Sequence, residues 1–107
     1  MDSRGRLWVS TDGMNDFDIA DGIFAMDVEG PGRGLPKAMF ACPVGAEATG
    51  PCFTPDGGTL FVSVQHPGED SDNVQQLTTR WPDFQDGMPP RPSVVAITKA
   101  DGGEFGS

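Results

Sequence analysis

Three residues of the sequence combine a donor atom suited to metal ions with a place beside or between apolar segments. Asp12 directly follows the apolar segment of residues 5–11, and His66 directly follows that of residues 59–65. Glu47 lies in a stretch rich in glycine and proline, whose small residues let a backbone approach an ion. Carboxylate oxygens suit hard cations such as calcium, and a neutral imidazole binds metals or donates to phosphate. We therefore take Asp12, Glu47 and His66 as candidate metal ligands.

Each candidate also has an interpretation that involves no metal. Asp12 precedes a glycine, as turn aspartates often do, and Glu47 suits an exposed loop. His66 precedes a proline and suits a strand end whose hydrogen bonds are satisfied. Asp21 lies before a glycine, where it fits ordinary turn chemistry or orients the loop that follows Asp12. The acidic segment 69–73 lacks the spaced glycine and terminal glutamate of an EF-hand, which favours a solvated loop.

A repeated segment supplies the strands that would carry these residues. Residues 5–10 and 58–63 share the order glycine, polar residue, leucine, aromatic residue, valine and serine, about fifty residues apart. The apolar segment 23–26 has a counterpart at 94–97, again after a glycine or proline turn. This second pair is further apart than the first, so the later unit contains extra residues, which lie within 65–91.

A repeat of strand pairs with this period, punctuated by glycine and proline, is typical of β-propeller blades. We therefore expect an all-β fold of about one and a half to two antiparallel β-propeller blades. One domain would span residues 1–107, with a first repeat unit at about 5–43, a second at about 50–103, and a long loop at about 66–92. Because blades bury their apolar faces against neighbours, such a chain is a fragment of a larger propeller or associates with itself or a partner.

The apolar pattern predicts strands at six places. Segments bounded by glycine, proline or aspartate lie at residues 5–11, 22–28, 37–43, 52–54, 59–65 and 93–98. Few residues of 37–43 are apolar, so this segment is expected to be an exposed outer strand. Residues 43–51 contain too much glycine and proline for regular structure and are expected to form a loop that crosses to the next blade. Residues 54–58 predict a tight turn.

The charge of the chain excludes one class of partner. Sixteen acidic residues against seven basic ones give a net charge of −9, which opposes binding to nucleic acids because phosphates require lysine and arginine. No segment approaches the roughly 20 apolar residues of a membrane span, so no membrane partner is expected. The first residues do not form a secretory signal, and the chain as given is expected in the cytoplasm.

The two cysteines leave several states open. Cys42 and Cys52 lie ten residues apart without the spacing of a zinc-binding pair, and the chain contains a single histidine. A self-contained zinc site is therefore not expected. The spacing is compatible with two buried thiols, with a disulfide between adjacent strands, or with a metal ligand.

Several blocks of the sequence resemble, in order, the C-terminal part of the PhoX-type bacterial alkaline phosphatases. These blocks lie at residues 6–13, 21–24, 43–51, 53–57, 60–69 and 81–95. The resemblance covers nearly the whole chain and rests on several ordered blocks. It implies a large single-chain propeller, exported to the periplasm or beyond, that hydrolyses phosphomonoesters.

The resemblance also implies a cofactor, a cluster of iron and calcium ions with a bridging oxo group, held by side chains from several blades. The chain would supply the last share of the ligands through Asp12, Glu47 and His66, and for Glu47 the resemblance carries most of this interpretation. The several hundred upstream residues of the family are absent from the sequence, with most of the cluster-binding segments. A multi-metal phosphatase site needs ions a few ångströms apart, and this chain has too few ligands to surround them. We therefore expect this chain alone to be inactive. A chain that holds no metal by itself is compatible with this.

Two other functions are compatible with the sequence. The chain could be a non-catalytic β-sheet module that forms homo-oligomers through exposed sheet edges and binds calcium weakly or not at all. A sugar-lactone hydrolase of the calcium-propeller type also places acidic residues at a channel mouth, but the ordered blocks do not support it.

Overall fold

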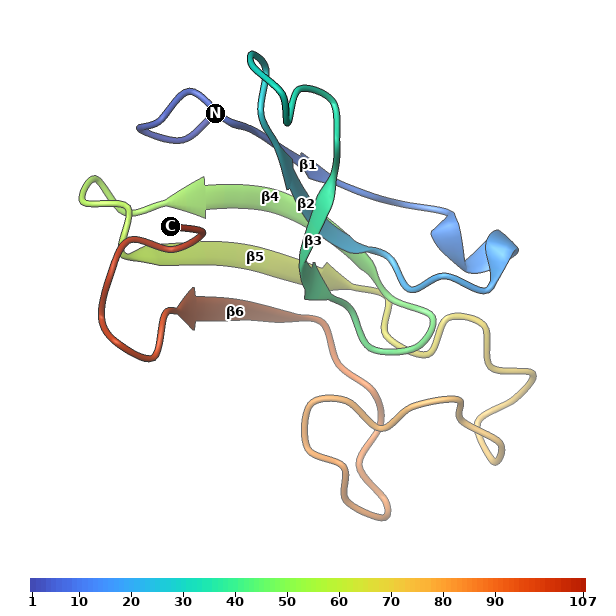
Figure 1. Ribbon diagram of the computed structural model, residues 1–107. Coiled ribbons are helices and arrows are strands. Elements are labelled where there is room, and N and C mark those ends of the chain that lie inside the picture. Colours follow the sequence, from blue (N-terminus) through green and yellow to red (C-terminus); the bar gives the residue numbers. More distant parts are fainter.

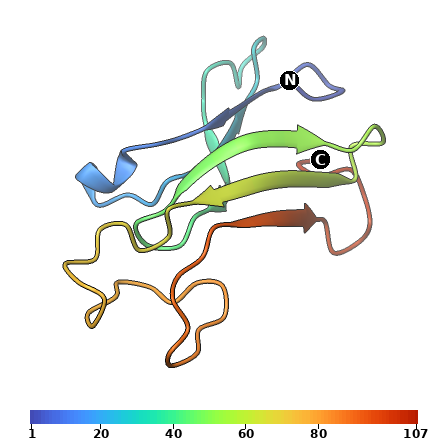
Figure 2. The same ribbon diagram turned by 180° about the vertical axis from the view of Figure 1, so that it is seen from behind.

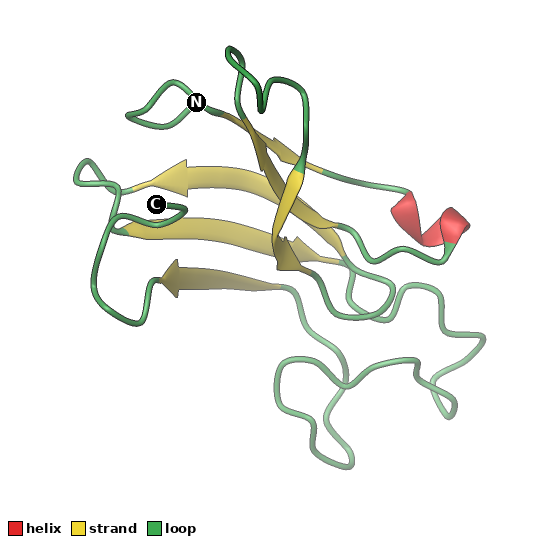
Figure 3. Cartoon of the chain, in the orientation of Figure 1, coloured by secondary structure: helices red, strands yellow, loops and turns green.

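The computed structural model describes residues 1–107 and is built almost entirely of strands (Figure 1; Figure 3). The strands form two three-stranded sheets, and every pair within them is antiparallel. The first sheet contains β1 (Leu7–Ser10), β2 (Gly22–Met26) and β3 (Lys37–Ala41), and the second contains β4 (Glu47–Phe53), β5 (Thr59–Gln65) and β6 (Ser93–Thr98). The predicted all-β fold is confirmed, with the strands of two incomplete propeller blades.

The only helix is a single 3-10 turn, η1 (Met14–Phe17), between the first two strands. No helix of the structure has the length and apolar character needed to cross a membrane.

The repeated segments occupy equivalent places in the two sheets. β1 and β5 hold the two copies of the first repeated segment, and each is followed by its antiparallel partner, β2 or β6. β3 adds a third strand beyond β2, whereas β4 adds one on the other side of β5. As the sequence predicts, β3 lies at a sheet edge and exposes much of its surface.

The core lies where the second sheet packs across the first. Only 14 of the 107 residues are buried, so a small set of side chains forms this core. Its apolar members come from both sheets and from the connection between them: Trp8, Ile23, Ala25, Cys42, Ala46, Ala48, Leu60, Val62 and Val64. β4 lies against β1, and the Ala48 amide donates to the Thr11 carbonyl oxygen at 3.4 Å.

Trp8 connects the core to the N-terminal loop. Its ring packs edge-on against Phe53, with the ring centres 4.9 Å apart, and also contacts Phe105. The Trp8 indole donates to the Asp2 carboxylate at 2.7 Å, and the Arg6 side chain donates to the same oxygen at 2.7 Å. Burial alone would raise the pKa of Asp2, but these hydrogen bonds outweigh burial and lower it.

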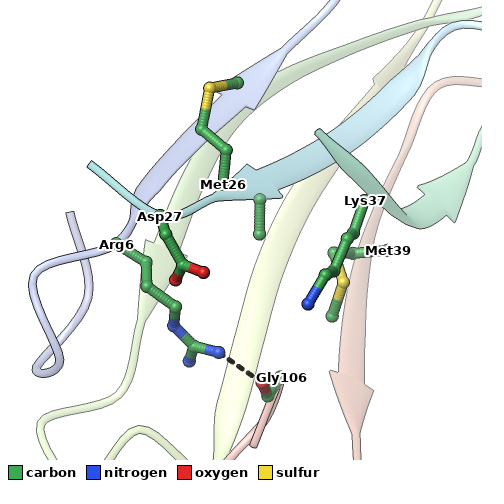
Figure 4. A pocket seen from close by; sticks show the side chains of 7 residues that line it. Arg6, Met26, Asp27, Lys37, Met39 and Gly106 are labelled. Carbon is green, nitrogen blue, oxygen red and sulfur yellow. Dashed lines mark hydrogen bonds between the residues drawn. The ribbon is translucent and has the colours of Figure 1, made fainter. Parts of the chain in front are cut away.

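The C-terminal tail closes the structure over the same tryptophan. The Phe105 amide donates to the Gly57 carbonyl oxygen at 2.9 Å, and Glu104 accepts hydrogen bonds from Ser3 and Arg4. Figure 4 shows the Arg6 guanidinium donating to the carbonyl oxygen of Gly106. Gly106 has a φ of +80°, and a Cβ there would lie 2.8 Å from the Trp8 ring, so the contact requires glycine. The tail thus ties the N-terminal loop to the second sheet.

The prediction of a crossing loop at 43–51 is wrong for residues 47–51, which belong to a strand. β4 begins at Glu47 and continues to Phe53, so the short strand predicted at 52–54 is only the end of a longer one. The pairing of β4 with β5 shifts register between Thr49 and Cys52. This bulge contains Gly50, with a φ of +61°, and a proline, so the strand accommodates both residues without ending.

The cysteines differ from each other in the structure. Both are free thiols, which removes the disulfide alternative, and Cys42 is buried whereas Cys52 is exposed. The prediction of two buried thiols is therefore wrong for Cys52. Burial, and after it the nearby charges of Asp21 and Glu47, raise the pKa of Cys42 to about 11.

We expect Asp2→Asn to lower the free energy of unfolding at pH 7 by about 2 kcal/mol, because charge-assisted hydrogen bonds to Trp8 and Arg6 are lost. The pKa of folded Asp2 lies below its ordinary value of 3.8, so its stabilisation is present above this pH. This stabilisation is lost as the pH falls through the folded value. Urea unfolding at pH 7 and pH 3 checks this, with Asp72→Asn as a control of equal charge change. An equal effect of both variants would contradict the role of Asp2.

We expect Cys52 to react with a thiol reagent in the folded chain and Cys42 to react only after unfolding. The thiolate is the reactive form, and burial together with the raised pKa of Cys42 suppresses it. Mass spectrometry of the alkylated protein, with and without denaturant, counts the modified residues. Two modified cysteines in the native protein would show that the Cys42 environment is open.

Candidate metal centre

The structure brings the three predicted ligands to one end of the strands. Asp12 follows β1, Glu47 is the first residue of β4, and His66 follows β5. Because Glu47 is paired with Gln65 in the β4–β5 ladder, the next residue, His66, reaches it, and His66 Nε2 lies 3.4 Å from Glu47 Oε1. The passage of β4 across β1 brings Glu47 to Asp12. Glu47 is therefore the central residue of the group.

The Glu47 and Asp12 carboxyl groups are neighbours in the wall of one groove. The pKa of Glu47 is raised, first because the protonated group donates a hydrogen bond to Asp12, then through burial and the negative charges of Asp12 and Glu69. The charge of His66 acts in the opposite direction. A carboxyl group whose pKa is raised by neighbouring negative charge is a place where a cation can offset that charge.

A groove of about 220 Å³ surrounds this pair. The acidic residues that line it are Asp12, Asp16, Asp21, Glu47, Glu69 and Asp70, and no lysine or arginine lines it. Such a concentration of negative charge attracts cations to the groove. A separate cavity of about 60 Å³, with Arg6, Asp27 and Lys37 in its wall, lies at the other end of β1 (Figure 4).

Asp21 holds the loop that follows Asp12. Its side chain is fully buried and accepts hydrogen bonds from the amides of Gly13 and Met14 and from the Asn15 side chain, at 3.0 to 3.1 Å. The prediction that Asp21 orients the Asp12 loop thus has a geometric basis, and these bonds define the η1 turn. Asp21 supports the site without belonging to the carboxylate pair.

Glu69 and Asp70 line the groove and are both exposed, in agreement with the solvated loop that the sequence favours for them. The Gly68 amide donates to the carbonyl oxygen of Val44, which holds the loop after β5 against the connection before β4. A Cβ at Gly45 would lie 2.1 Å from an Asp70 carboxylate oxygen, so glycine is needed for this approach. The run of acidic residues at 69–73 is the sequence signal that could have pointed to Glu69 and Asp70. Their position at the groove depends on the contact between the loop after β5 and the connection before β4.

The side chains of Asp12, Glu47 and His66 suit part of a metal site. No group of three or more histidine, cysteine, aspartate or glutamate side chains is arranged to hold a metal ion. The carboxylate pair offers the oxygen ligands that calcium prefers, and an adjacent imidazole suits iron. Calcium takes six to eight oxygen ligands, so Asp12, Glu47 and His66 fit a share of a site whose other ligands come from elsewhere.

A comparison with known families gives one match. The family model described as alkaline phosphatase PhoX matches residues 1–68, which include β1 to β5 and all three predicted ligands. No curated protein and no solved structure matches the chain. Because the match spans more than half of the 107 residues, the chain belongs to the PhoX family of alkaline phosphatases.

Proposed function

We propose that this chain contributes ligands to the metal centre of a PhoX-type phosphatase that hydrolyses phosphomonoesters with iron and calcium ions. The observation that carries the proposal is the contact of Glu47 with both Asp12 and His66, within the part of the chain that matches the family. The ligands would come from the ends of three different strands: Asp12 and Glu47 line one groove, and His66 lies beside Glu47. We place the complete enzyme in the periplasm or outside the cell, as the family resemblance implies.

Each of the three residues has its own role in this proposal. Asp12 and Glu47 would provide the negative charge that holds cations, and the raised pKa of Glu47 means that protons compete with a cation at this carboxyl group. His66 is 59% exposed at its side chain, so it is free to turn toward a metal or to donate to a phosphate oxygen. Bound ions would supply charge stabilisation for the transferring phosphoryl group and an activated water.

The chain alone is proposed to lack phosphatase activity, because too few of its side chains converge. A second candidate function, a non-catalytic β-sheet module that binds calcium weakly, is favoured by the same observation. Both candidates predict an inactive chain, and hydrolysis of para-nitrophenyl phosphate in the presence of calcium and iron tests this shared expectation. Turnover that Asp12→Ala or Glu47→Ala abolishes would show that this chain builds a working site by itself. Absence of both turnover and calcium binding would remove the metal role of the groove.

We expect any calcium that this chain binds to lie in the groove and Glu47→Gln to weaken that binding about tenfold, because one of two charged ligands is lost. The raised pKa of Glu47 means that protons compete with calcium, so affinity increases as the pH rises above the ordinary value of 4.5. Isothermal titration calorimetry at several pH values measures this. Glu29→Gln, at an exposed turn away from the groove, is the matched control. Equal affinities for the two variants would contradict the site.

The same carboxyl pair makes a prediction for the metal-free chain. A group whose pKa is raised by folding stabilises the fold below its ordinary value and loses that effect as the pH rises through the folded value. We therefore expect Glu47→Gln to raise the melting temperature at neutral pH relative to the parent chain, and to lose this advantage below pH 4.5. Thermal melts followed by circular dichroism test the sign. A variant that is less stable at neutral pH would show that the pair is not repulsive.

We expect Asp21→Asn to weaken calcium binding about tenfold, because a residue that orients a metal ligand affects affinity without touching the ion. The asparagine keeps the shape of the side chain but cannot accept all three hydrogen bonds from Gly13, Met14 and Asn15. Asn15→Ala removes one of these bonds and should have a smaller effect. Calorimetric titration of both variants, after circular dichroism has shown that they fold, measures the difference. Unchanged affinity in folded Asp21→Asn would limit Asp21 to stability.

A further inference from the structure

The internal repeat identifies a strand position that is empty beside β6. β2 and β6 are counterparts, and each pairs with the preceding strand of its repeat, β1 or β5. β2 also pairs with β3 on its other side, whereas no strand lies beyond β6 (Figure 1; Figure 2). The outer edge of β6 therefore presents unpaired backbone donors and acceptors where its counterpart is covered.

The edges of the other three outermost strands have features that oppose strand addition. β1 is only four residues long, and its end is held by the bond from β4 to the Thr11 carbonyl oxygen. β3 begins with Lys37 and shifts register against β2. β4 begins with Glu47 and contains the bulge with Gly50. Charges, bulges and short length are the devices that protect sheet edges in monomeric proteins.

β6 has none of these protective features. The segment Ser93–Thr98 contains no charged residue, glycine or proline, and it pairs with β5 over all six residues without a register shift. Val94, in this strand, is 70% exposed. A regular, uncharged strand rich in β-branched residues at a sheet edge recruits another strand.

We propose that this edge pairs with β6 of a second copy of the chain, antiparallel, to give one continuous six-stranded sheet. A twofold axis perpendicular to the sheet keeps the same face of both copies on the same side, so Val95 or Ala96 lies opposite its own counterpart. When Val95 lies opposite its own counterpart, Ser93 lies opposite Ile97. When Ala96 lies opposite its own counterpart, Val94 lies opposite Thr98. Neither register brings like charges together across the strands.

The charges beside β6 also permit this pairing. Arg91, before the strand, forms an ion pair with Asp83 at 2.8 Å, and Lys99, after it, pairs with Asp101 at 3.3 Å. The basic residues at both ends are therefore neutralised within each copy. The net charge of −9 on each chain acts against association, so the dimer should strengthen as salt screens this repulsion. None of Asp12, Glu47 and His66 takes part, and the pairing is independent of the proposed metal site.

Sedimentation velocity of the 107-residue chain, from micromolar to millimolar concentration, tests the proposal. We expect a concentration-dependent dimer that Ala96→Lys abolishes, because two lysines meet near the twofold axis. Ala38→Lys places the same charge on exposed β3 and is the matched control, expected to leave the dimer intact. Ala96→Glu alone should also be monomeric, and an equimolar mixture of Ala96→Lys and Ala96→Glu should restore a dimer, which a loss of folding would not produce.

Two results would overturn the proposal. A chain that stays monomeric at millimolar concentration would show that the β6 edge does not pair with its copy, as expected if it accepts only a strand of a longer protein. A dimer that persists in Ala96→Lys and Ala96→Glu would place the interface elsewhere. Circular dichroism checks that the variants fold, and Val94→Lys, on the same exposed face of β6, takes their place if they do not.

Discussion

The packing of β4 across β1 is the contact on which both the core and the candidate metal centre depend. It buries Ala46 and Ala48 against the first sheet and is fixed by the hydrogen bond from the Ala48 amide to the Thr11 carbonyl oxygen. The residues on either side of this bond, Glu47 and Asp12, are brought together as a direct consequence. Small side chains are required at this crossing because the two strands approach closely. The same packing that stabilises the fold therefore places two carboxyl groups beside each other, which raises the pKa of Glu47.

The sequence predicted the repeated strands well because their signal is local. Apolar residues recur along 59–65 and run almost without interruption through 93–98, and turn residues bound both segments. The strands lie where this pattern places them. β4 was largely missed for an equally local reason, since Gly50 and the following proline act as strand breakers unless a bulge absorbs them. The bulge exists because the neighbouring β5 holds the strand in place, and that pairing is a tertiary property.

The candidate site shows the same division between local and non-local information. The residue types of Asp12, Glu47 and His66 suggested metal chemistry, but their closeness depends on the register of β4 with β5 and on the crossing over β1. Asp21 is a turn aspartate in the sequence and a fully buried acceptor of three hydrogen bonds in the structure. Nothing in the local pattern distinguishes these two states, because the burial of Asp21 depends on contacts with distant residues such as Cys42, whose amide donates to the Asp21 carbonyl oxygen at 2.7 Å. Glu69 and Asp70 reach the groove only through the contact between their loop and Val44.

The family match and the folded unit do not end at the same place. The match stops at Gly68, just after β5, whereas the strand that covers the other side of β5 and the tail that covers Trp8 lie beyond it. Leu60, Val62 and Val64 are fully buried in part because β6 pairs beside them. The tail, through Glu104 and Phe105, fixes the N-terminal loop that precedes β1. Residues outside the matched segment thus hold β1 and β5 in the positions from which Asp12 and His66 reach Glu47. A metal centre assigned to the matched segment therefore depends, for its geometry, on the 39 residues that follow it.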